Sequence, residues 1–132
     1  MTGALRILIV EDNPMIAMDL AELLTTLGHN ICAISRTEGE AVSAATLAKP
    51  DLLIVDQHLA EGCGVSAIRR LLMRGAAPHF YVTGDPGDVY TMQPNAIVVP
   101  KPYDRQDLID AIVKVNVRHR WNIIEHVIQM EQ

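Results

Sequence analysis

The sequence is poor in cysteine and in long apolar runs, and each shortage narrows the class of protein. Its two cysteines, Cys32 and Cys63, are too few for a disulfide framework or a zinc site. We therefore expect reduced, partly buried thiols and a cytoplasmic location. No run approaches the 18 uninterrupted apolar residues of a membrane span, and the N-terminus, with its single Arg6, does not resemble a signal peptide. These absences predict a protein without a membrane partner.

Basic and aromatic residues are also scarce. Eleven Lys and Arg stand against 16 Asp and Glu, which gives a net charge of −5. Because nucleic-acid backbones are bound by basic surfaces, we do not expect this chain to bind nucleic acid directly. Aromatic residues make up only 4% of the chain, so aliphatic side chains must fill the core. The length of 132 residues is typical of one soluble domain.

Short apolar runs alternate with amphipathic stretches along the chain. Asn13 and Pro14 are typical of a helix start, and Gly28 is typical of a helix end. Strands that are apolar throughout, with helices between them, indicate a parallel sheet covered on both faces. We predict an α/β fold with five strands, near 5–10, 30–34, 52–55, 79–82 and 96–99, and with helices near 14–27, 38–48, 64–75 and from 104 onward.

Polar residues with related chemistry follow four of the predicted strands. Glu11 and Asp12 follow the first strand, Asp56 the third, Thr83 the fourth and Lys101 the fifth. The carboxyl ends of parallel strands share one edge, and ligands bind at that edge in open α/β sheets. Three acids, a hydroxyl and a lysine at one edge predict a site for a divalent cation and a phosphoryl group.

The motifs around these residues resemble those of the receiver domain of two-component response regulators. The resemblance covers roughly residues 4–117 and rests on five motifs in the family's order: Leu8–Pro14, Leu53–Asp56, Gly64, Thr83–Gly84 and Lys101–Pro102. It implies a doubly wound, flavodoxin-like sheet with the strand order 2-1-3-4-5. It also implies that the Lys101–Pro102 bond is cis.

The resemblance assigns a role to each polar residue. Asp56 would be the nucleophile that takes a phosphoryl group from a phosphohistidine of a sensor histidine kinase. Thr83 would donate its hydroxyl to a phosphoryl oxygen, and Lys101 would offset the negative charge. Mg²⁺ would be held by oxygen ligands: Glu11, Asp12, Asp56 and the backbone carbonyl of His58. The chain would catalyse only its own phosphorylation and dephosphorylation, and we do not expect an enzyme with another substrate.

Three features depart from the usual receiver pattern. Ala60 and Val98 stand where a proline and an aromatic switch residue are common, and the interval from Thr83 to Lys101 is short. This interval has little helical periodicity, so we expect a short fourth helix or a loop. If Val98 cannot switch, phosphorylation would reorder segment 84–95.

These departures are shared by a subgroup of receivers, nicknamed FATGUY. Two segments, Phe80–Gly84 and Lys101–Tyr103, resemble the signatures of that subgroup imperfectly. The partners of the subgroup are commonly histidine kinases of the HWE type, and the resemblance implies such a kinase here.

The C-terminal segment, 118–132, follows the predicted receiver domain, 1–117. It contains Trp121 and several aliphatic residues, and it either extends the last helix or forms another one. The sequence leaves open whether it packs on the domain or forms a surface for a homodimer or a partner. It is too short for a DNA-binding output domain, so we expect a single-domain regulator in a phosphorelay, with an unknown downstream protein target.

Two other functions are compatible with parts of the pattern. A pseudo-receiver would act as a protein-interaction scaffold without being phosphorylated, and the unusual switch region leaves this alternative open. A haloacid dehalogenase-type phosphohydrolase also uses Asp, Thr, Lys and Mg²⁺. Its nucleophile follows the first strand within Asp-x-Asp, however, whereas here Glu11, Asp12 and Asn13 follow that strand.

Overall fold

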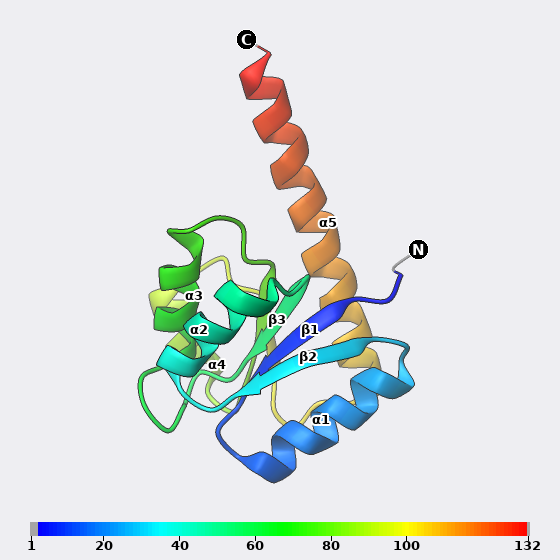
Figure 1. The fold of residues 1–132 in the computed structure, drawn as a ribbon, viewed down its shortest axis with the longest axis vertical. Helices are drawn as coiled ribbons and strands as arrows, with labels where there is room; N and C mark the ends of the chain where they lie inside the picture. The colour runs from blue at the N-terminus through cyan, green and yellow to red at the C-terminus, as the bar shows by residue number, and fades with distance from the viewer. Residues whose placement is uncertain (1–2, 132) are drawn as a thin grey trace.

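The structure, a computed structural model, describes residues 3–131 as alternating strands and helices (Figure 1). The strands form one parallel sheet in the order β2-β1-β3-β4-β5. This arrangement confirms the predicted α/β class and the flavodoxin-like strand order. The elements of the described chain are β1 Arg6–Val10, α1 Pro14–Thr26, β2 Asn30–Ser35, α2 Glu38–Ala48, β3 Leu52–Val55, α3 Gly64–Leu72, β4 His79–Thr83, α4 Pro86–Met92, β5 Val98–Pro100 and α5 Arg105–Met130.

The sheet lies between two layers of helices. Helices α1 and α5 pack on one face, and α2, α3 and α4 cover the other (Figure 1). Successive residues of a strand point to opposite faces. Accordingly, β1 places Ile7 and Ile9 in the first core, and Leu8 and Val10 in the second. Both faces are buried, which is why the strands are apolar throughout.

The ends of the elements follow local chemistry. The Asn13 side chain accepts hydrogen bonds from the backbone of Met15 and Ile16, as expected of the predicted helix start. Gly28 has a φ of +97° directly after α1, a conformation that favours glycine. The fifth strand begins at Val98, later than predicted, because the Ala96 N–H bonds back to the Gln93 carbonyl.

Helices α3 and α4 are both short. Helix α3 ends at Leu72 rather than at Gly75 as predicted, because the Arg74 N–H closes a turn on the Leu71 carbonyl. Helix α4 has seven residues, and Val89 is its buried residue. A short fourth helix was one of the two predicted outcomes for the interval between Thr83 and Lys101.

Helix α5 runs without a break for 26 residues, and its second half projects beyond the sheet (Figure 1). Val115 is its last buried residue, and every described residue from Arg120 to Glu131 is exposed. The segments proposed from the sequence, 1–117 and 118–132, include residues 1, 2 and 132, which lie outside the described residues. Within residues 3–131, no helix combines the length and hydropathy that a membrane span requires.

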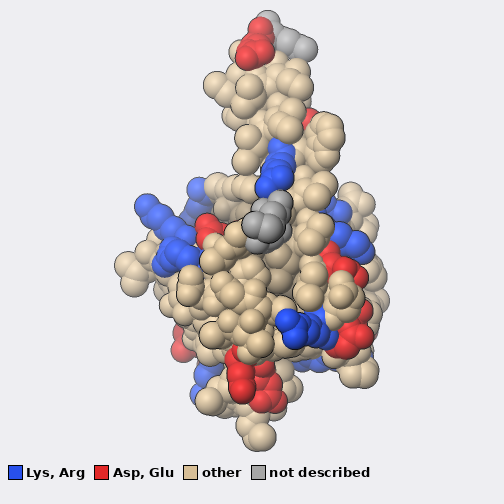
Figure 2. All heavy atoms as spheres, turned by 90° about the vertical axis from the view of Figure 1, so that its right-hand side faces the viewer, with Lys and Arg blue, Asp and Glu red and all other residues tan. Residues whose placement is uncertain are grey.

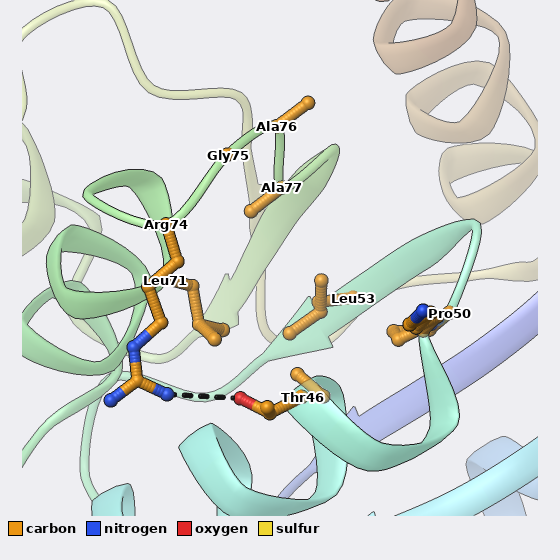
Figure 3. A pocket seen from close by; sticks show the side chains of 10 residues that line it. Thr46, Pro50, Leu53, Leu71, Arg74, Gly75, Ala76 and Ala77 are labelled. Carbon is orange, nitrogen blue, oxygen red and sulfur yellow. Dashed lines mark hydrogen bonds between the residues drawn. The ribbon is translucent and has the colours of Figure 1, made fainter.

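A hollow of about 320 Å³ opens between α2 and α3 (Figure 3). Arg74 Nη1 donates a hydrogen bond to Thr46 Oγ1 at its rim, at 3.1 Å. Its floor is formed near the amino-terminal ends of β3 and β4, by Leu53 and Ala77 among others. The hollow therefore lies away from the carboxyl edge that carries the predicted site residues.

Gly64, at the start of α3, touches the backbone of Asp56. A Cβ at Gly64 would lie 2.7 Å from Val55 Cγ1 and would collide with the Asp56 carbonyl oxygen. We predict that Gly64→Ala lowers the free energy of unfolding by about 1–3 kcal/mol through overpacking. Gly39→Ala in α2, where a Cβ meets open space, should raise it by up to about 1 kcal/mol. Urea unfolding compares both variants with the native chain, and an unchanged midpoint for Gly64→Ala contradicts the prediction.

Candidate functional site

Three carboxylates meet where β1 and β3 end. One carboxylate oxygen from each of Glu11, Asp12 and Asp56 lies within 4.8 Å of the other two. They meet because β1 and β3 are paired in register, with Val10 opposite Val55, so the residues after each strand are neighbours. Glu11 is 4% exposed and Asp56 is 9% exposed, so two of the three charges are largely removed from water.

Lys101 supplies the positive charge of this cluster. Its Nζ donates to Glu11 Oε1 at 3.2 Å and to Asp56 Oδ2 at 3.1 Å. The Lys101 N–H donates to the Thr83 carbonyl, which fixes the start of this loop to the end of β4. The Lys101–Pro102 bond is cis, as the resemblance implied.

The charges of the cluster shift its proton equilibria. Burial raises the pKa of Glu11 to about 7, against the opposing effect of the Asn13 N–H that donates to it, and the Asp56 charge adds to the rise. Burial alone would lower the pKa of Lys101, but Asp56 and Glu11 outweigh it and raise that pKa. One lysine thus only partly offsets three carboxylates. Such a set of hard oxygen donors fits Mg²⁺, and Glu11, Asp12 and Asp56 could hold it.

Thr83 is fully buried at the end of β4, the strand next to β3. Its Oγ1 accepts a hydrogen bond from the Asp85 N–H at 3.0 Å. Asp85 is the N-cap of α4. The hydroxyl that the sequence placed at the site is therefore connected directly to the start of α4.

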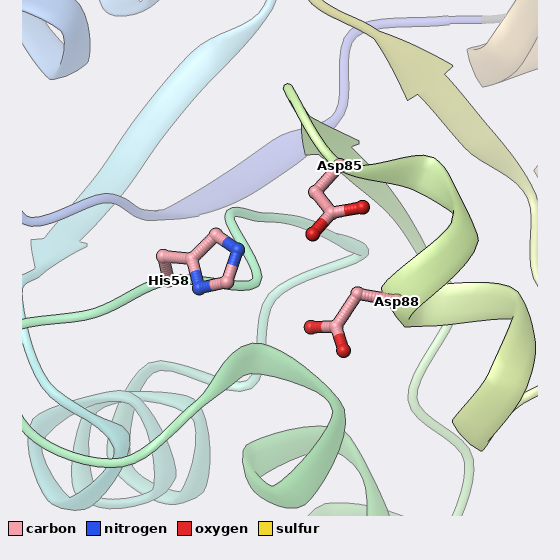
Figure 4. A group of neighbouring side chains, drawn as sticks. All are labelled: His58, Asp85 and Asp88. Carbon is pink, nitrogen blue, oxygen red and sulfur yellow. The ribbon is translucent and has the colours of Figure 1, made fainter.

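His58 lies in the loop after Asp56, and its N–H donates to Asp56 Oδ1 at 3.2 Å. Its role as a metal ligand through the backbone carbonyl stays a prediction. Its imidazole is exposed and lies beside two carboxylates of the α4 segment, Asp85 and Asp88 (Figure 4). One donor atom from each of these three side chains lies within 4.8 Å of the others. The sequence analysis gave a role only to the backbone carbonyl of His58 and did not connect its imidazole with α4.

Gln57 is a site residue that sequence reasoning missed. It is 2% exposed, and its Oε1 accepts from the Val65 N–H at 2.9 Å. Its Nε2 donates to Asp88 Oδ2 and to Met92 Sδ, both at 3.3 Å. The side chain next to Asp56 thus links its loop to both α3 and α4. A polar residue directly after an apolar strand was the available signal, but its partners lie far along the chain.

An aromatic contact to α4 comes from β4 rather than from β5. Val98 occupies the usual position of the aromatic switch residue and pairs with Tyr81 in the sheet. Tyr81 is fully buried, and its hydroxyl donates to Gln93 Oε1 at 2.6 Å, at the end of α4. The aromatic side chain that reaches α4 is therefore fixed in the core.

Comparisons with known proteins agree with this geometry. The family model of the response regulator receiver domain matches residues 7–113. The phyllosphere-induced regulator PhyR of Methylorubrum extorquens is 39% identical over 104 residues, which are 76% of this chain and 39% of PhyR. The transcriptional regulatory protein PdtaR of Mycobacterium tuberculosis is 35% identical over 111 residues, which are 81% of this chain and 54% of PdtaR.

Solved structures show the same likeness. The solution structure of the receiver domain of Erythrobacter litoralis PhyR has a TM-score of 0.80 at 30% identity, and the match covers 87% of this chain and 92% of that one. The anti-anti-sigma factor PhyR from Bartonella quintana has a TM-score of 0.78 at 29% identity, over 96% of this chain and 52% of that one.

The fold and the site thus define a receiver domain, and this chain belongs to the response regulator receiver family of two-component signalling. The match to PhyR and PdtaR spans about two fifths to one half of those two proteins.

The raised pKa of Glu11 predicts a specific pH dependence of stability. The folded state keeps this proton up to about pH 7, whereas the ordinary pKa is 4.5. The folded state therefore binds more protons between these values, and stability falls as pH rises from 4.5 to 7. The total fall from this group is about 2–3 kcal/mol. In Glu11→Gln, which cannot bind this proton, the free energy of unfolding should fall less over the same pH range. Urea unfolding of both chains in metal-free buffer from pH 5 to 8 measures this difference. If the free energies of unfolding of the two chains change in parallel with pH, the raised pKa of Glu11 is contradicted.

Proposed function

We propose that this chain is a response regulator that accepts a phosphoryl group on Asp56 in a phosphorelay. The observation that carries the proposal is the Asp56 carboxylate, held by Lys101 within a cluster of three acids at the sheet edge. An Asp56 oxygen attacks the phosphorus of a phosphohistidine on a sensor histidine kinase. A new P–O bond forms as the P–N bond breaks, and the histidine nitrogen keeps the electron pair.

The surrounding residues prepare Asp56 for this transfer. Its Oδ2 faces the Lys101 ammonium and its Oδ1 accepts from the His58 N–H, so the carboxylate is fixed in orientation. Lys101 is positioned to offset the negative charge that the phosphoryl oxygens bring. Mg²⁺ would be held by Glu11, Asp12, Asp56 and the His58 carbonyl, and when bound it supplies further positive charge.

We infer that the signal leaves the site through α4. A phosphoryl group adds about −1.5 to −2 charges at Asp56, and we propose that the Thr83 hydroxyl donates to it. The same hydroxyl accepts from the Asp85 N–H at the start of α4. Helix α4 is short and has one buried residue, Val89. Segments with so few apolar anchors reorder readily, so we propose that segment 84–95 responds.

The partners follow from the family and the subgroup. Response regulators of this family interact with histidine kinases and with downstream proteins. We propose a kinase of the HWE type, on the strength of the FATGUY-like segments Phe80–Gly84 and Lys101–Tyr103. The downstream target would be a protein that binds segment 84–95 differently before and after phosphorylation of Asp56.

Phosphorylation of Asp56 is tested by intact mass. The native chain, incubated with Mg²⁺ and acetyl phosphate, should gain one phosphoryl group, and hydroxylamine should remove it. Asp56→Asn should gain none, because the amide is not a nucleophile of this kind. Asp110→Asn on exposed α5 makes the same chemical change away from the site and should behave like the native chain.

Two outcomes would count against phosphoryl acceptance at Asp56. An adduct that persists in Asp56→Asn would place the acceptor elsewhere. No adduct on the folded native chain, with either acetyl phosphate or a phosphorylated kinase as donor, would favour the alternative of a non-phosphorylated scaffold.

The role of Thr83 is tested by hydrogen exchange of segment 84–95. Beryllofluoride, an analogue of the phosphoryl group, should change exchange in this segment of the native chain. Thr83→Val should lose most of that change, because the hydroxyl that contacts both the phosphoryl group and Asp85 is gone, whereas Thr83→Ser should keep it. Asp56 should still be phosphorylated in both variants. An undiminished response in Thr83→Val would show that the signal leaves by another route.

A further inference from the structure

The projecting half of α5 carries an apolar seam that is open to solvent. The seam consists of Val117, Trp121, Ile124 and Ile128, whose spacings of four, three and four residues are those of a coiled coil. These four side chains are 45–59% exposed. Exposed apolar residues that are contiguous rather than scattered indicate a protein contact.

We propose that this seam binds the same seam of a second copy of the chain, with the two helices antiparallel. The spacing continues to Lys114 at one end of the seam and to Glu131 at the other. In a parallel pair, Lys114 would lie opposite Lys114 of the second copy and Glu131 opposite Glu131, so like charges would meet. If Trp121 instead lies opposite Ile124 of the second copy, Val117 meets Ile128 and Lys114 meets Glu131. Each pair of facing residues is then either two apolar side chains or two side chains of opposite charge.

The flank of the seam shows the same complementarity. Arg118 and Glu125 lie seven residues apart on one side of the seam, so antiparallel pairing brings each Arg118 close to Glu125 of the second copy. In Figure 2, basic atoms gather near the base of the projecting helix and acidic atoms lie at its tip, while the surface between them is mostly uncharged apart from a small acidic area.

The base of the helix offers room for the tip of a second helix. A hollow of about 450 Å³ lies beside Val113, Val117 and Trp121, with Ile97 of the domain on its other side. In the antiparallel register, Ile128 of the second copy falls next to Val117 and can enter this hollow. An apolar side chain there would cover surface that the described chain leaves open.

The arrangement leaves both phosphoryl-acceptor sites free. Helix α5 starts near the carboxyl edge of the sheet and runs back along it, so its projecting end lies away from Asp56 (Figure 1). Residues 114 to 131 overlap over roughly 26 Å at 1.5 Å per residue, which places the two domains at opposite ends of the pair. In this arrangement a phosphoryl donor can therefore still reach Asp56 in both copies.

Sedimentation velocity on the full chain over a range of concentrations tests the dimer. The native chain should dimerise, and Ile124→Asp should weaken the dimer at least tenfold by placing a charge in the central layers. Leu47→Asp, the same kind of change at an exposed residue of α2, is the matched control and should not. Acetyl phosphate should still modify Ile124→Asp, which separates this test from that of Asp56. A native chain that stays monomeric, or an Ile124→Asp dimer of native strength, overturns the proposal.

A charge exchange tests the antiparallel register. Lys114→Glu alone or Glu131→Lys alone should weaken the dimer, because each places like charges in one layer. The double variant should restore it. In a parallel pair each single change merely replaces one like-charge contact by another, so single variants with native affinity would overturn the antiparallel arrangement.

Discussion

The contact of Lys101 with two acids is the interaction on which the functional end of this molecule depends. Glu11 and Asp56 are nearly buried, and their charges repel each other at short range. The Lys101 ammonium, 3.2 and 3.1 Å from them, offsets part of this repulsion. Burial raises the pKa of Glu11 to about 7, and the Asp56 charge adds to the rise, whereas the hydrogen bond from Lys101 opposes it. The cluster thus carries more carboxylates than its single lysine can balance, which is the kind of donor set that a divalent cation fits.

The same edge of the sheet is mechanically connected to α4 by three separate contacts. Thr83 accepts from Asp85, Gln57 donates to Asp88, and Tyr81 donates to Gln93. These contacts join strands that are fixed in the core to a helix with little apolar surface of its own. These hydrogen bonds are the contacts through which the proposed change of charge at Asp56 would act on α4, a helix of seven residues whose buried residue is Val89.

Much of this arrangement was predictable, because local patterns decide it. Runs of apolar residues predicted strands that are buried on both faces. Asn13 before Pro14 predicted the start of α1, and Gly28 predicted its end. The positions of the acids after their strands predicted one shared edge. The end of α3 and the start of β5 were predicted less well, because turn hydrogen bonds such as that of Ala96 with Gln93 set them.

The sequence by itself determined the parallel α/β fold and the kinds of residue at the site, because strand periodicity and motif order require no long-range information. The tertiary structure alone decided how buried Glu11 is, and hence its pKa, since desolvation depends on everything packed around it. It also decided that Gln57 reaches Asp88, 31 residues away. Finally, it decided that α5 continues past the domain with its apolar seam exposed, because whether an amphipathic helix packs on its own domain depends on the space beside it.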